Sequence, residues 1–589
     1  MESRLPCPYL FVAVLLLLNS FSPVDATDLK PKLRRPVSLS LSEDDRWLYT
    51  ANRNSGDISV IDTSTRSVVR EIQVGGRLSD VATLSDTRLL ALDEEEHQLV
   101  LLSGRNDQWR VAGKLDVPKY PVRLCVDKQA NQCFISSLWS RSVTKVDLSG
   151  AGRARNPQIQ IAGRAQLSFE PREMCLARKA NRLIVAGSFK NTLAVFDTSD
   201  LELVTTKDVS GHNIRGLAIG INGERLLLTQ QELNPLARST RDDVHWGNMV
   251  TNLLVSFRLD DVCNPQANVM KQRDVTYLGE PGNAAGDPGS IAVGPAGQIA
   301  VSLGGVNELA VGRENDQDSF KRMSVGNHPR DVVWTTGGII YVADMFSDSV
   351  SIVDATCTQK VERVVLGPQP ELSPADIGEM LFFDSRISHD GWMSCHSCHS
   401  DGHSSGQLND NLSDGSYSAP KRVLSLLGVS QTGPWAWNGG SKSLEDQVKS
   451  SIENTMQGAR PPTENVDSIV AYLKTLEAPP ALPVVGVNQK IVTDQIDRGR
   501  ELFRSLDCQN CHSPPFYTVA DTFDIGLTDA VGNARFNPPS LRGVGRRSKF
   551  FHDASATSLR EVLVDREHQL NRELSSTELD LLLLFLKTI

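Results

Sequence analysis

A repeat of roughly 40 to 50 residues restricts the fold of this chain more than any other feature. From position 36 to position 366 the sequence repeats a run of alternating apolar residues, a polar turn, a second run, a turn and a third run. One such set is RWLYTA (46–51), DISVID (57–62) and VVREIQV (68–74). Alternation with a period of two predicts half-buried strands. A repeat of about 40 residues with several strands in each unit is typical of β-propeller blades.

The number of blades follows from the residues that open each unit. These openings lie near Pro36, Leu78, Pro121, Pro171, Ile214, Pro288 and Pro329. An insertion at 232–252 blurs one boundary, so the predicted count is seven, with six or eight as alternatives. The units at 57–75, 192–204 and 349–367 resemble blades of YVTN-type propellers from secreted bacterial proteins. We therefore predict an all-β, seven-bladed, YVTN-like β-propeller over residues 36–366. A propeller alone indicates no particular ligand.

Helical patterns replace the strand patterns after about position 367. SLEDQVKSSI (443–452) and VDSIVAYLKTL (466–476) carry apolar residues at helical spacing. A Pro-rich linker at 478–490 divides this region into two halves. The chain is therefore multidomain, with a mainly α-helical region following the propeller.

The two helical halves are related to each other. GEMLF (378–382) in the first half is echoed by GRELF (499–503) in the second. An internal duplication is the simplest explanation, and it predicts two mainly α-helical domains at 367–477 and 491–589.

Each half contains one Cys-x-x-Cys-His motif. The copies are CHSCH, with Cys395, Cys398 and His399, and CQNCH, with Cys508, Cys511 and His512. Two thiols at this spacing can add to the two vinyl groups of a haem, and the adjacent histidine can donate to its iron. A closed zinc site and a thioredoxin-like redox pair are the alternatives. The duplicated helical context and a secretory signal favour two covalently bound haem c groups.

That signal occupies residues 1–26. Arg4 precedes a short apolar run at 10–18, and a small-x-small cleavage candidate ends at Ala26. The run is too short to span a membrane, and no later segment has 18 uninterrupted apolar residues. We therefore expect a mature protein without a transmembrane segment in the periplasm, where disulfides are tolerated.

The net charge bears on nucleic-acid binding, and two propeller cysteines bear on disulfide formation. The formal net charge of -10 comes from 61 basic and 71 acidic residues without a long single-sign block, which argues against nucleic-acid binding. In the propeller, Cys125 and Cys133 either bridge neighbouring strands or remain buried free thiols.

Four segments of the helical region carry a family resemblance. They are GEMLFFDSRIS (378–388) before the first CxxCH, WNG (437–439), FNPPSLRGV (536–544) and FHD (551–553). In this order they resemble bacterial di-haem cytochrome c peroxidases and the related MauG proteins. The resemblance implies two cytochrome c-like domains that face one another, each with a covalently bound haem c.

The resemblance also implies roles for individual residues. The haem ligated by His399 would be the peroxide-reacting centre, and the haem ligated by His512 would be the six-coordinate electron-transfer centre. Trp437 matches the family tryptophan between the haems, where an indole can bridge two redox centres; a structural core tryptophan is the alternative. Gln447 matches a family glutamine.

This sequence departs from the family pattern at the residue that would carry a proton to or from peroxide and at the residues that would bind calcium. Counted without gaps from Trp437, the family's distal glutamate falls on Gln457, whose amide does not titrate. Glu453, one helical turn earlier, is the candidate substitute. The positions of the family's interdomain calcium site read Val423, Arg547 and Lys549, so we expect no calcium there.

The sixth ligand of the second haem is Met or Tyr in the family, and the matching segment here, VLVDREHQ (562–569), contains neither. His568 in that segment is the axial candidate, with a solvated histidine at a helix end as the alternative. Imidazole ligation would lower the reduction potential relative to Met ligation. His403 and Met456 are weaker ligand candidates for the first haem.

Together these features predict a secreted, peroxidase-type di-haem oxidoreductase. Electrons would pass from a donor protein, such as a small cytochrome or a cupredoxin, through the His512 haem to the His399 haem, with hydrogen peroxide as a candidate substrate. The alternative is a non-peroxidatic electron-transfer or redox-sensing cytochrome whose propeller docks a protein partner.

Overall fold

The computed structural model describes residues 30–105, 108–152, 158–358, 360–412, 415–483 and 489–589. The predicted secretory signal at 1–26 and part of the predicted linker, 484–488, lie outside the described residues. Of the helices that the structure describes, none has the length and apolar character needed to cross a membrane.

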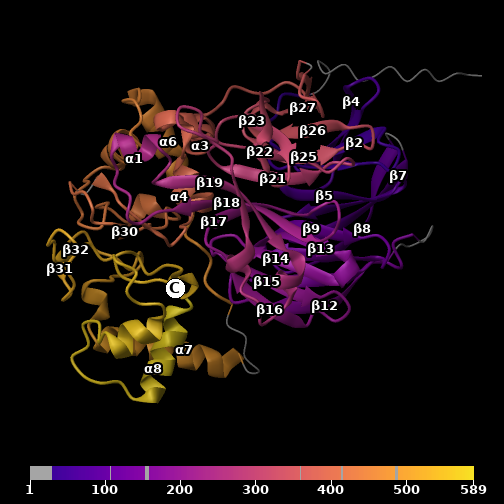
Figure 1. The fold of residues 1–589 in the computed structure, drawn as a ribbon. Coiled ribbons are helices and arrows are strands. Elements are labelled where there is room, and N and C mark those ends of the chain that lie inside the picture. Colours follow the sequence, from indigo (N-terminus) through magenta and orange to yellow (C-terminus); the bar gives the residue numbers. More distant parts are fainter. Residues whose placement is uncertain (1–29, 106–107, 153–157, 359, 413–414, 484–488) are drawn as a thin grey trace, which may run out of the picture.

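Seven antiparallel sheets of four strands form the N-terminal part (Figure 1). The first four blades comprise β1 (Pro36–Leu41), β2 (Trp47–Asn52), β3 (Asp57–Asp62), β4 (Ser67–Gln73), β5 (Leu78–Ser85), β6 (Arg88–Asp93), β7 (Gln98–Arg105), β8 (Gln108–Asp116), β9 (Pro121–Asp127), β10 (Gln132–Ser137), β11 (Ser142–Asp147), β12 (Gln160–Gln166), β13 (Pro171–Ala177), β14 (Arg182–Gly187), β15 (Thr192–Asp197) and β16 (Leu203–Asp208). The last three comprise β17 (His212–Ile219), β18 (Arg225–Leu233), β19 (Val250–Arg258), β20 (Asp274–Tyr277), β21 (Pro288–Val293), β22 (Gln298–Leu303), β23 (Glu308–Arg313), β24 (Asp316–Ser324), β25 (Pro329–Trp334), β26 (Ile339–Asp344), β27 (Ser349–Asp354) and β28 (Glu362–Val365).

The first strand of each blade lines the centre of a closed ring. Each of these strands contacts the first strand of the next blade, and β25 contacts β1. The predicted seven-bladed propeller is therefore confirmed, and each blade has a fourth strand beyond the three runs that the repeat showed. Six predicted openings are the first residue of such a strand, whereas β17 begins at His212, two residues before Ile214.

Cys125 on β9 and Cys133 on β10 are free thiols on adjacent strands. Cys125 pairs in register with Phe134, and Cys133 pairs with Val126. Because neighbouring positions on a strand point to opposite faces, the two thiols enter different apolar clusters. Burial raises the pKa of Cys125 to about 12, so this thiol stays protonated. Of the two alternatives, the structure has the free thiols.

The helical region contains short helices joined by long loops. Its elements are α3 (Pro374–Phe382), α4 (Cys395–Cys398), β29 (Leu408–Asn409), β30 (Lys421–Arg422), α5 (Leu444–Ser450), α6 (Thr463–Thr475), α7 (Gln489–Ser505), β31 (Phe523–Asp524), β32 (Arg535–Phe536) and α8 (Ser576–Leu586), with π-helical turns at Ser451–Thr455 and Glu561–Asp565. In the propeller, α1 (Arg241–His245) and α2 (Leu259–Cys263) belong to the fifth blade.

The two halves of the helical region each contain a glycine at which one helix packs closely against another. A Cβ atom on Gly378 of α3 would lie 1.9 Å from the carbonyl oxygen of Ser468 on α6. A Cβ atom on Gly499 of α7 would lie 2.2 Å from the carbonyl oxygen of Leu581 on α8. A side chain at either position would separate two packed helices, so the glycines in GEMLF and GRELF permit the same helix pairing twice.

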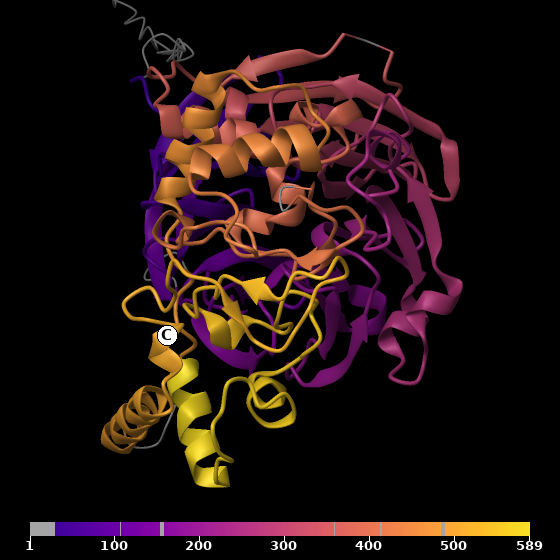
Figure 2. The same ribbon diagram turned by 90° about the vertical axis from the view of Figure 1, so that its left-hand side faces the viewer.

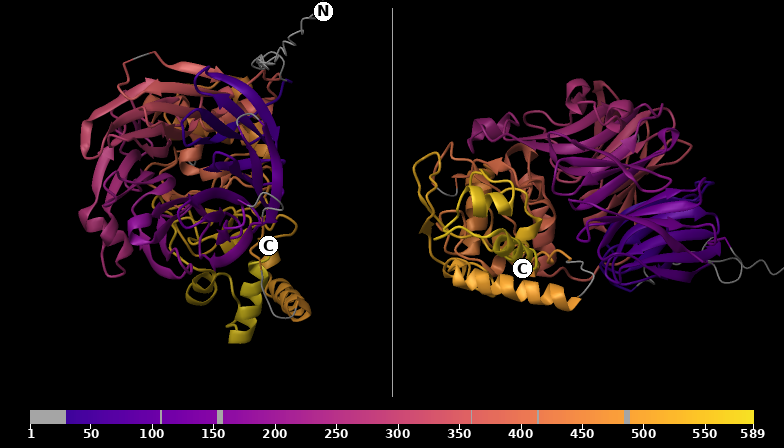
Figure 3. Two further views of the ribbon diagram at one scale, coloured as in Figure 1. Left: turned by 90° about the vertical axis from the view of Figure 1, so that its right-hand side faces the viewer. Right: turned by 90° about the horizontal axis from the view of Figure 1, so that it is seen from below.

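The helical region lies over one face of the propeller (Figure 2), and α7 and α8 extend past the propeller's edge (Figure 3). The first half shares an apolar core with the insertion of the fifth blade. Val244 and Met249 of the insertion join Phe382, Trp392 and Ile452 of the helical region in one buried cluster. The insertion is therefore a docking element between the propeller and the helical region.

Candidate haem-binding sites

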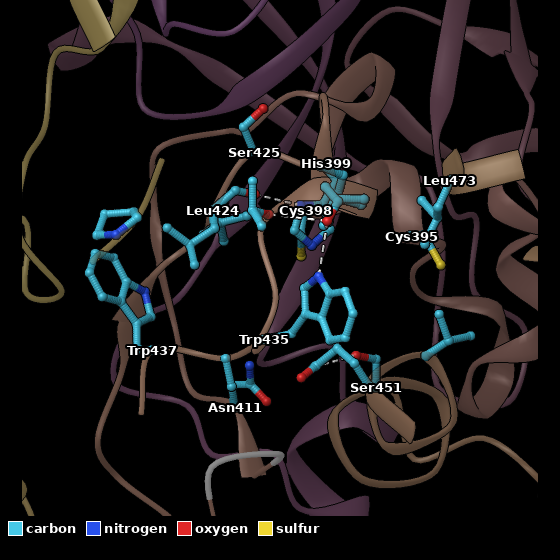
Figure 4. Close-up of a pocket in the computed structure, with 18 of the residues that line it drawn as sticks. Cys395, Cys398, His399, Asn411, Leu424, Ser425, Trp435, Trp437, Ser451 and Leu473 are labelled. Atoms are coloured by element: carbon cyan, nitrogen blue, oxygen red, sulfur yellow. Dashed lines mark hydrogen bonds between the residues drawn. The ribbon is translucent and has the colours of Figure 1, made fainter. Parts of the chain in front are cut away.

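The first CxxCH motif opens onto a cavity of about 230 Å³. Cys395, Cys398 and His399 line this cavity, and Figure 4 shows them around one space with residues from other segments. The second helical domain also contributes to its wall, through Asn537, Pro539, Ser540, Arg542 and Arg547. The cavity therefore lies where the two helical domains meet.

The motif itself is one turn of helix, α4, with a capped N-terminus. Ser394 is the N-cap, and its backbone N–H donates to the hydroxyl of Ser397 at 2.9 Å. The N–H of His399 donates to the carbonyl of Cys395 at 2.9 Å. This turn brings both thiols and the imidazole to the same cavity.

The propeller holds this turn from behind. Asp287, the residue before β21, accepts hydrogen bonds from the hydroxyls of Ser394 and Ser397, the latter at 2.7 Å. His212 Nε2 lies 2.7 Å from the Ser397 carbonyl oxygen, to which it donates, and the side chain of His396 is 2% exposed. Burial alone would raise the pKa of Asp287, but His396, whose Nδ1 lies 3.6 Å from Asp287 Oδ1, and the hydroxyls of the two serines hold it below its usual value.

The ring of His399 is oriented by a backbone carbonyl. Its Nδ1 lies 2.9 Å from the oxygen of Leu424, to which it donates a hydrogen bond. The other nitrogen, Nε2, is then the atom with a lone pair for a metal. Burial lowers the pKa of His399 to about 4, which favours the neutral imidazole that binds iron.

Two buried guanidinium groups on the cavity wall fit the acidic groups of a haem. Burial lowers the pKa of Arg422 to about 9 and that of Arg547 to about 10. Among the described residues, neither forms a salt bridge with a carboxylate, and no Asp or Glu lines the cavity. A haem carries two propionates, and charge-assisted hydrogen bonds would compensate these buried cations. The thiols, the imidazole and the arginines together therefore fit a covalently bound haem.

Trp437 lies at the boundary between the two helical domains. Its Nε1 donates to the carbonyl oxygen of Arg422 at 2.8 Å, and its own carbonyl accepts from the N–H of Asn537 at 2.7 Å. Its ring centroid is 6.5 Å from that of Phe536 and 6.3 Å from that of His552. The indole thus contacts the second domain while it lines the cavity of the first.

Uncharged polar groups form another part of the wall. Gln447 lines the cavity and donates through Nε2 to the hydroxyl of Ser451 at 3.2 Å. His403 and Met456, the weaker ligand candidates, also line the cavity. The Nδ1 atom of His403 lies 2.9 Å from the hydroxyl of Ser425.

The structure does not bring Glu453 or Gln457 to this wall. Glu453 Oε1 lies 3.9 Å from Nε of Arg460, whose side chain is exposed. Gln457 has a left-handed backbone (φ 52°), and its Nε2 donates to the carbonyl of Ser239 at 2.7 Å and to that of Asn454 at 2.6 Å. Ser239 belongs to the propeller insertion, so Gln457 forms a hydrogen bond between the helical region and the propeller. The catalytic roles of both residues stay predictions.

The second motif, around Cys508 and Cys511, repeats the histidine orientation. His512 Nδ1 lies 3.2 Å from the oxygen of Tyr517, to which it donates, so Nε2 again remains for a metal. Burial lowers the pKa of His512 to about 4, with a smaller contribution from the charge of His568. His568 is half-buried and packs edge-on against Phe551, with ring centroids 5.4 Å apart. The predicted axial candidate therefore lies near the second motif.

The sequence pointed to none of four roles at this site: those of His212 and Asp287 at the first motif, and those of Arg422 and Arg547 as cations of the cavity wall. Asp287 and His212 act on the motif across more than one hundred positions of sequence, and no local pattern marks such contacts. A buried arginine without a carboxylate partner becomes visible only once the fold buries it.

Sequence comparisons relate the helical region to known proteins. Residues 373–482 match the family described as di-haem cytochrome c peroxidase. Cytochrome c551 peroxidase of Nitrosomonas europaea is 24% identical over 269 residues, 36% of this chain and 79% of that protein. Methylamine utilization protein MauG of Methylorubrum extorquens is 27% identical over 250 residues, 33% of this chain and 70% of that protein. A solved structure of Kuenenia stuttgartiensis hydrazine synthase aligns with a TM-score of 0.48 and 15% identity, covering 56% of this chain and 99% of that chain. The C-terminal region is therefore similar to the di-haem cytochrome c peroxidase and MauG family of haem oxidoreductases, and here it follows a seven-bladed β-propeller.

Proposed function

We propose that this protein is a periplasmic di-haem c-type oxidoreductase. Cys395, Cys398 and His399 would hold one haem, and Cys508, Cys511 and His512 the other. When bound, each haem supplies a one-electron redox centre whose potential depends on its axial ligands and surroundings. The observation that carries the proposal is the cavity beside His399, which is walled by both helical domains and has Trp437 at their boundary.

The chain's own residues would bind and orient the two centres. The backbone carbonyls of Leu424 and Tyr517 hold the two imidazoles in the orientation that iron binding requires. Arg422 and Arg547 would neutralise propionates inside the cavity. Trp437 would lie on the path between the two centres, because it contacts both domains. A small cytochrome or a cupredoxin is the class of electron donor we propose.

Hydrogen peroxide is the oxidant we propose for the centre at His399. Peroxide takes up two electrons and two protons to give two water molecules, and two reduced haems, if bound by the two CxxCH motifs, would supply those two electrons. One equivalent of peroxide should therefore oxidise both centres of the fully reduced protein.

A specific observation favours a second candidate, a non-peroxidatic electron-transfer or redox-sensing cytochrome with the propeller as its docking module. Among the described residues that line the cavity there is no Asp or Glu, so no carboxylate there is placed to carry a proton. Failure of peroxide to oxidise the reduced protein would favour this candidate and contradict the first.

Trp437→Leu should slow electron transfer between the haems at least about tenfold, which is about 1.4 kcal/mol in activation free energy. The leucine removes the aromatic ring that contacts both domains, whereas haem attachment does not use Trp437. Stopped-flow absorbance after rapid mixing with a reductant measures the rate.

Trp435→Leu is the matched control for this experiment. Trp435 lines the same cavity, but its Nε1 donates to the carbonyl of Val429 in the first domain at 3.1 Å. Equal slowing in both variants, or no slowing in Trp437→Leu, would contradict the proposed path.

His568→Ala should convert the second haem from low spin to high spin, because the substitution removes the proposed sixth ligand near His512. Its reduction potential should change, while the signals of the first haem stay the same. EPR and optical spectra of the oxidised holoprotein measure this. A spectrum identical to that of the wild type would exclude His568 as the axial ligand.

Glu453→Ala should change peroxide turnover by less than about twofold, because a proton carrier must come within hydrogen-bond reach of the reacting group. The carboxylate of Glu453 pairs with Arg460 away from the cavity wall. Gln447→Ala, which alters the wall itself, should have the larger effect on turnover measured with a reduced donor. A loss of about 10²-fold or more in Glu453→Ala would instead support Glu453 as the general acid.

A further inference from the structure

Two histidines and one aspartate gather where the propeller insertion meets the helical region. His245 ends α1 in the insertion, and His389 and Asp390 lie in the segment that leads to Cys395. Their ligand atoms all lie within 4.8 Å of one another. This cluster is separate from both CxxCH motifs, and neither the family resemblance nor the proposed function uses it.

The spacing of these atoms is close to that of a metal site. His245 Nδ1 lies 2.6 Å from Asp390 Oδ2, and His389 Nδ1 lies 3.5 Å from Asp390 Oδ1. The two imidazole rings are stacked, with centroids 5.6 Å apart. Ligand bonds of about 2.0 to 2.1 Å in a tetrahedral site separate neighbouring ligand atoms by about 3.3 Å. Small side-chain adjustments would therefore bring all three residues to one ion.

Hydrogen bonds hold the three residues in place. The backbone N–H of His389 donates to the carbonyl of Met456 at 3.0 Å, and the backbone N–H of Gly282 donates to Asp390 Oδ2 at 3.2 Å. The indole Nε1 of Trp392 donates to the carbonyl of His245 at 3.0 Å. These bonds come from separate segments, so the cluster is positioned before any ion arrives, which lowers the cost of binding.

We propose that His245, His389 and Asp390 form a binding site for a divalent transition-metal ion such as Zn²⁺. Two imidazoles and one carboxylate suit Zn²⁺ and its neighbours, whereas Mg²⁺ and Ca²⁺ prefer oxygen ligands alone. The side chains of His389 and Asp390 are 16% exposed and that of His245 is 38% exposed, so water can complete the coordination.

The site would connect two parts of the molecule. One ligand comes from the propeller and two come from the segment before the first haem-attachment turn, so the ion would cross-link them. An ion that binds only the folded chain stabilises it by mass action. The inference does not depend on peroxide chemistry, and it holds even if the proposed function is wrong.

The test uses the full-length holoprotein after treatment with a chelator, which leaves covalently attached haem in place. Isothermal titration with Zn²⁺ should show one tight equivalent per chain, and Mg²⁺ should show none. Zn²⁺ should also raise the melting temperature. His245→Ala, His389→Ala and Asp390→Asn should each weaken Zn²⁺ binding at least about tenfold and abolish the thermal shift.

His97→Ala is the matched control, because His97 lies in the propeller with its ring nitrogen 2.8 Å from the carbonyl of Glu94, outside the cluster. It should keep the tight equivalent. If a His389 or Asp390 variant does not fold, His245→Gln on the short helix α1 carries the test, with haem absorbance as the check on folding. Absence of a tight equivalent in the wild type, or Zn²⁺ binding unchanged by these substitutions, would show that the contact of Asp390 with His245 is only a hydrogen bond and would overturn the proposal.

Discussion

The buried carboxylate of Asp287 in the propeller holds the first CxxCH turn of the helical region in place. It accepts hydrogen bonds from both serines of the first CxxCH turn, and the two residues between the cysteines, His396 and Ser397, are buried against the propeller. A buried carboxylate is costly unless it is fully hydrogen-bonded, so these partners must be in place when the chain folds. The position of the turn, and of any haem attached to it, therefore depends on the propeller as well as on the helical domain.

Further contacts between the propeller and the helical region also hold the first helical domain in place. The insertion of the fifth blade adds Val244 and Met249 to the apolar core of the first helical domain, and Gln457 donates to the carbonyl of Ser239 in the same insertion. The second domain contributes Arg547 to the cavity wall and contacts Trp437 through Phe536. The two helical domains thus line the cavity beside His399, with the thiols and Arg422 from the first and Arg547 from the second, while the propeller holds the first CxxCH turn.

Local signals in the sequence predicted the architecture well. The blade openings, the two CxxCH motifs and the paired glycines Gly378 and Gly499 each reflect contacts within about one repeat or one helix pair. The contacts of Asp287 and His212 with the first motif join residues far apart in the sequence, and no periodicity encodes them. Counting without gaps assigned Gln457 to the position of the family's glutamate, but it could not show where the side chain lies. The helix ends in a π-helical turn at Ser451–Thr455, and the amide of Gln457, on a left-handed backbone, donates to Ser239 of the propeller insertion.

The central claim is that the propeller positions the first CxxCH turn through Asp287 and thereby influences the haem proposed there. The reduction potentials of the two proposed haems test it most directly. Asp287→Asn removes a buried negative charge that acts on both Cys395 and Cys398 while it preserves the shape of the side chain. Net charge near a haem helps to set its potential, and loss of an anion disfavours the oxidised state. Spectroelectrochemical titration should therefore show a higher potential for the first haem and an unchanged potential for the second. Equal shifts in both haems, or no shift in either, would contradict the account.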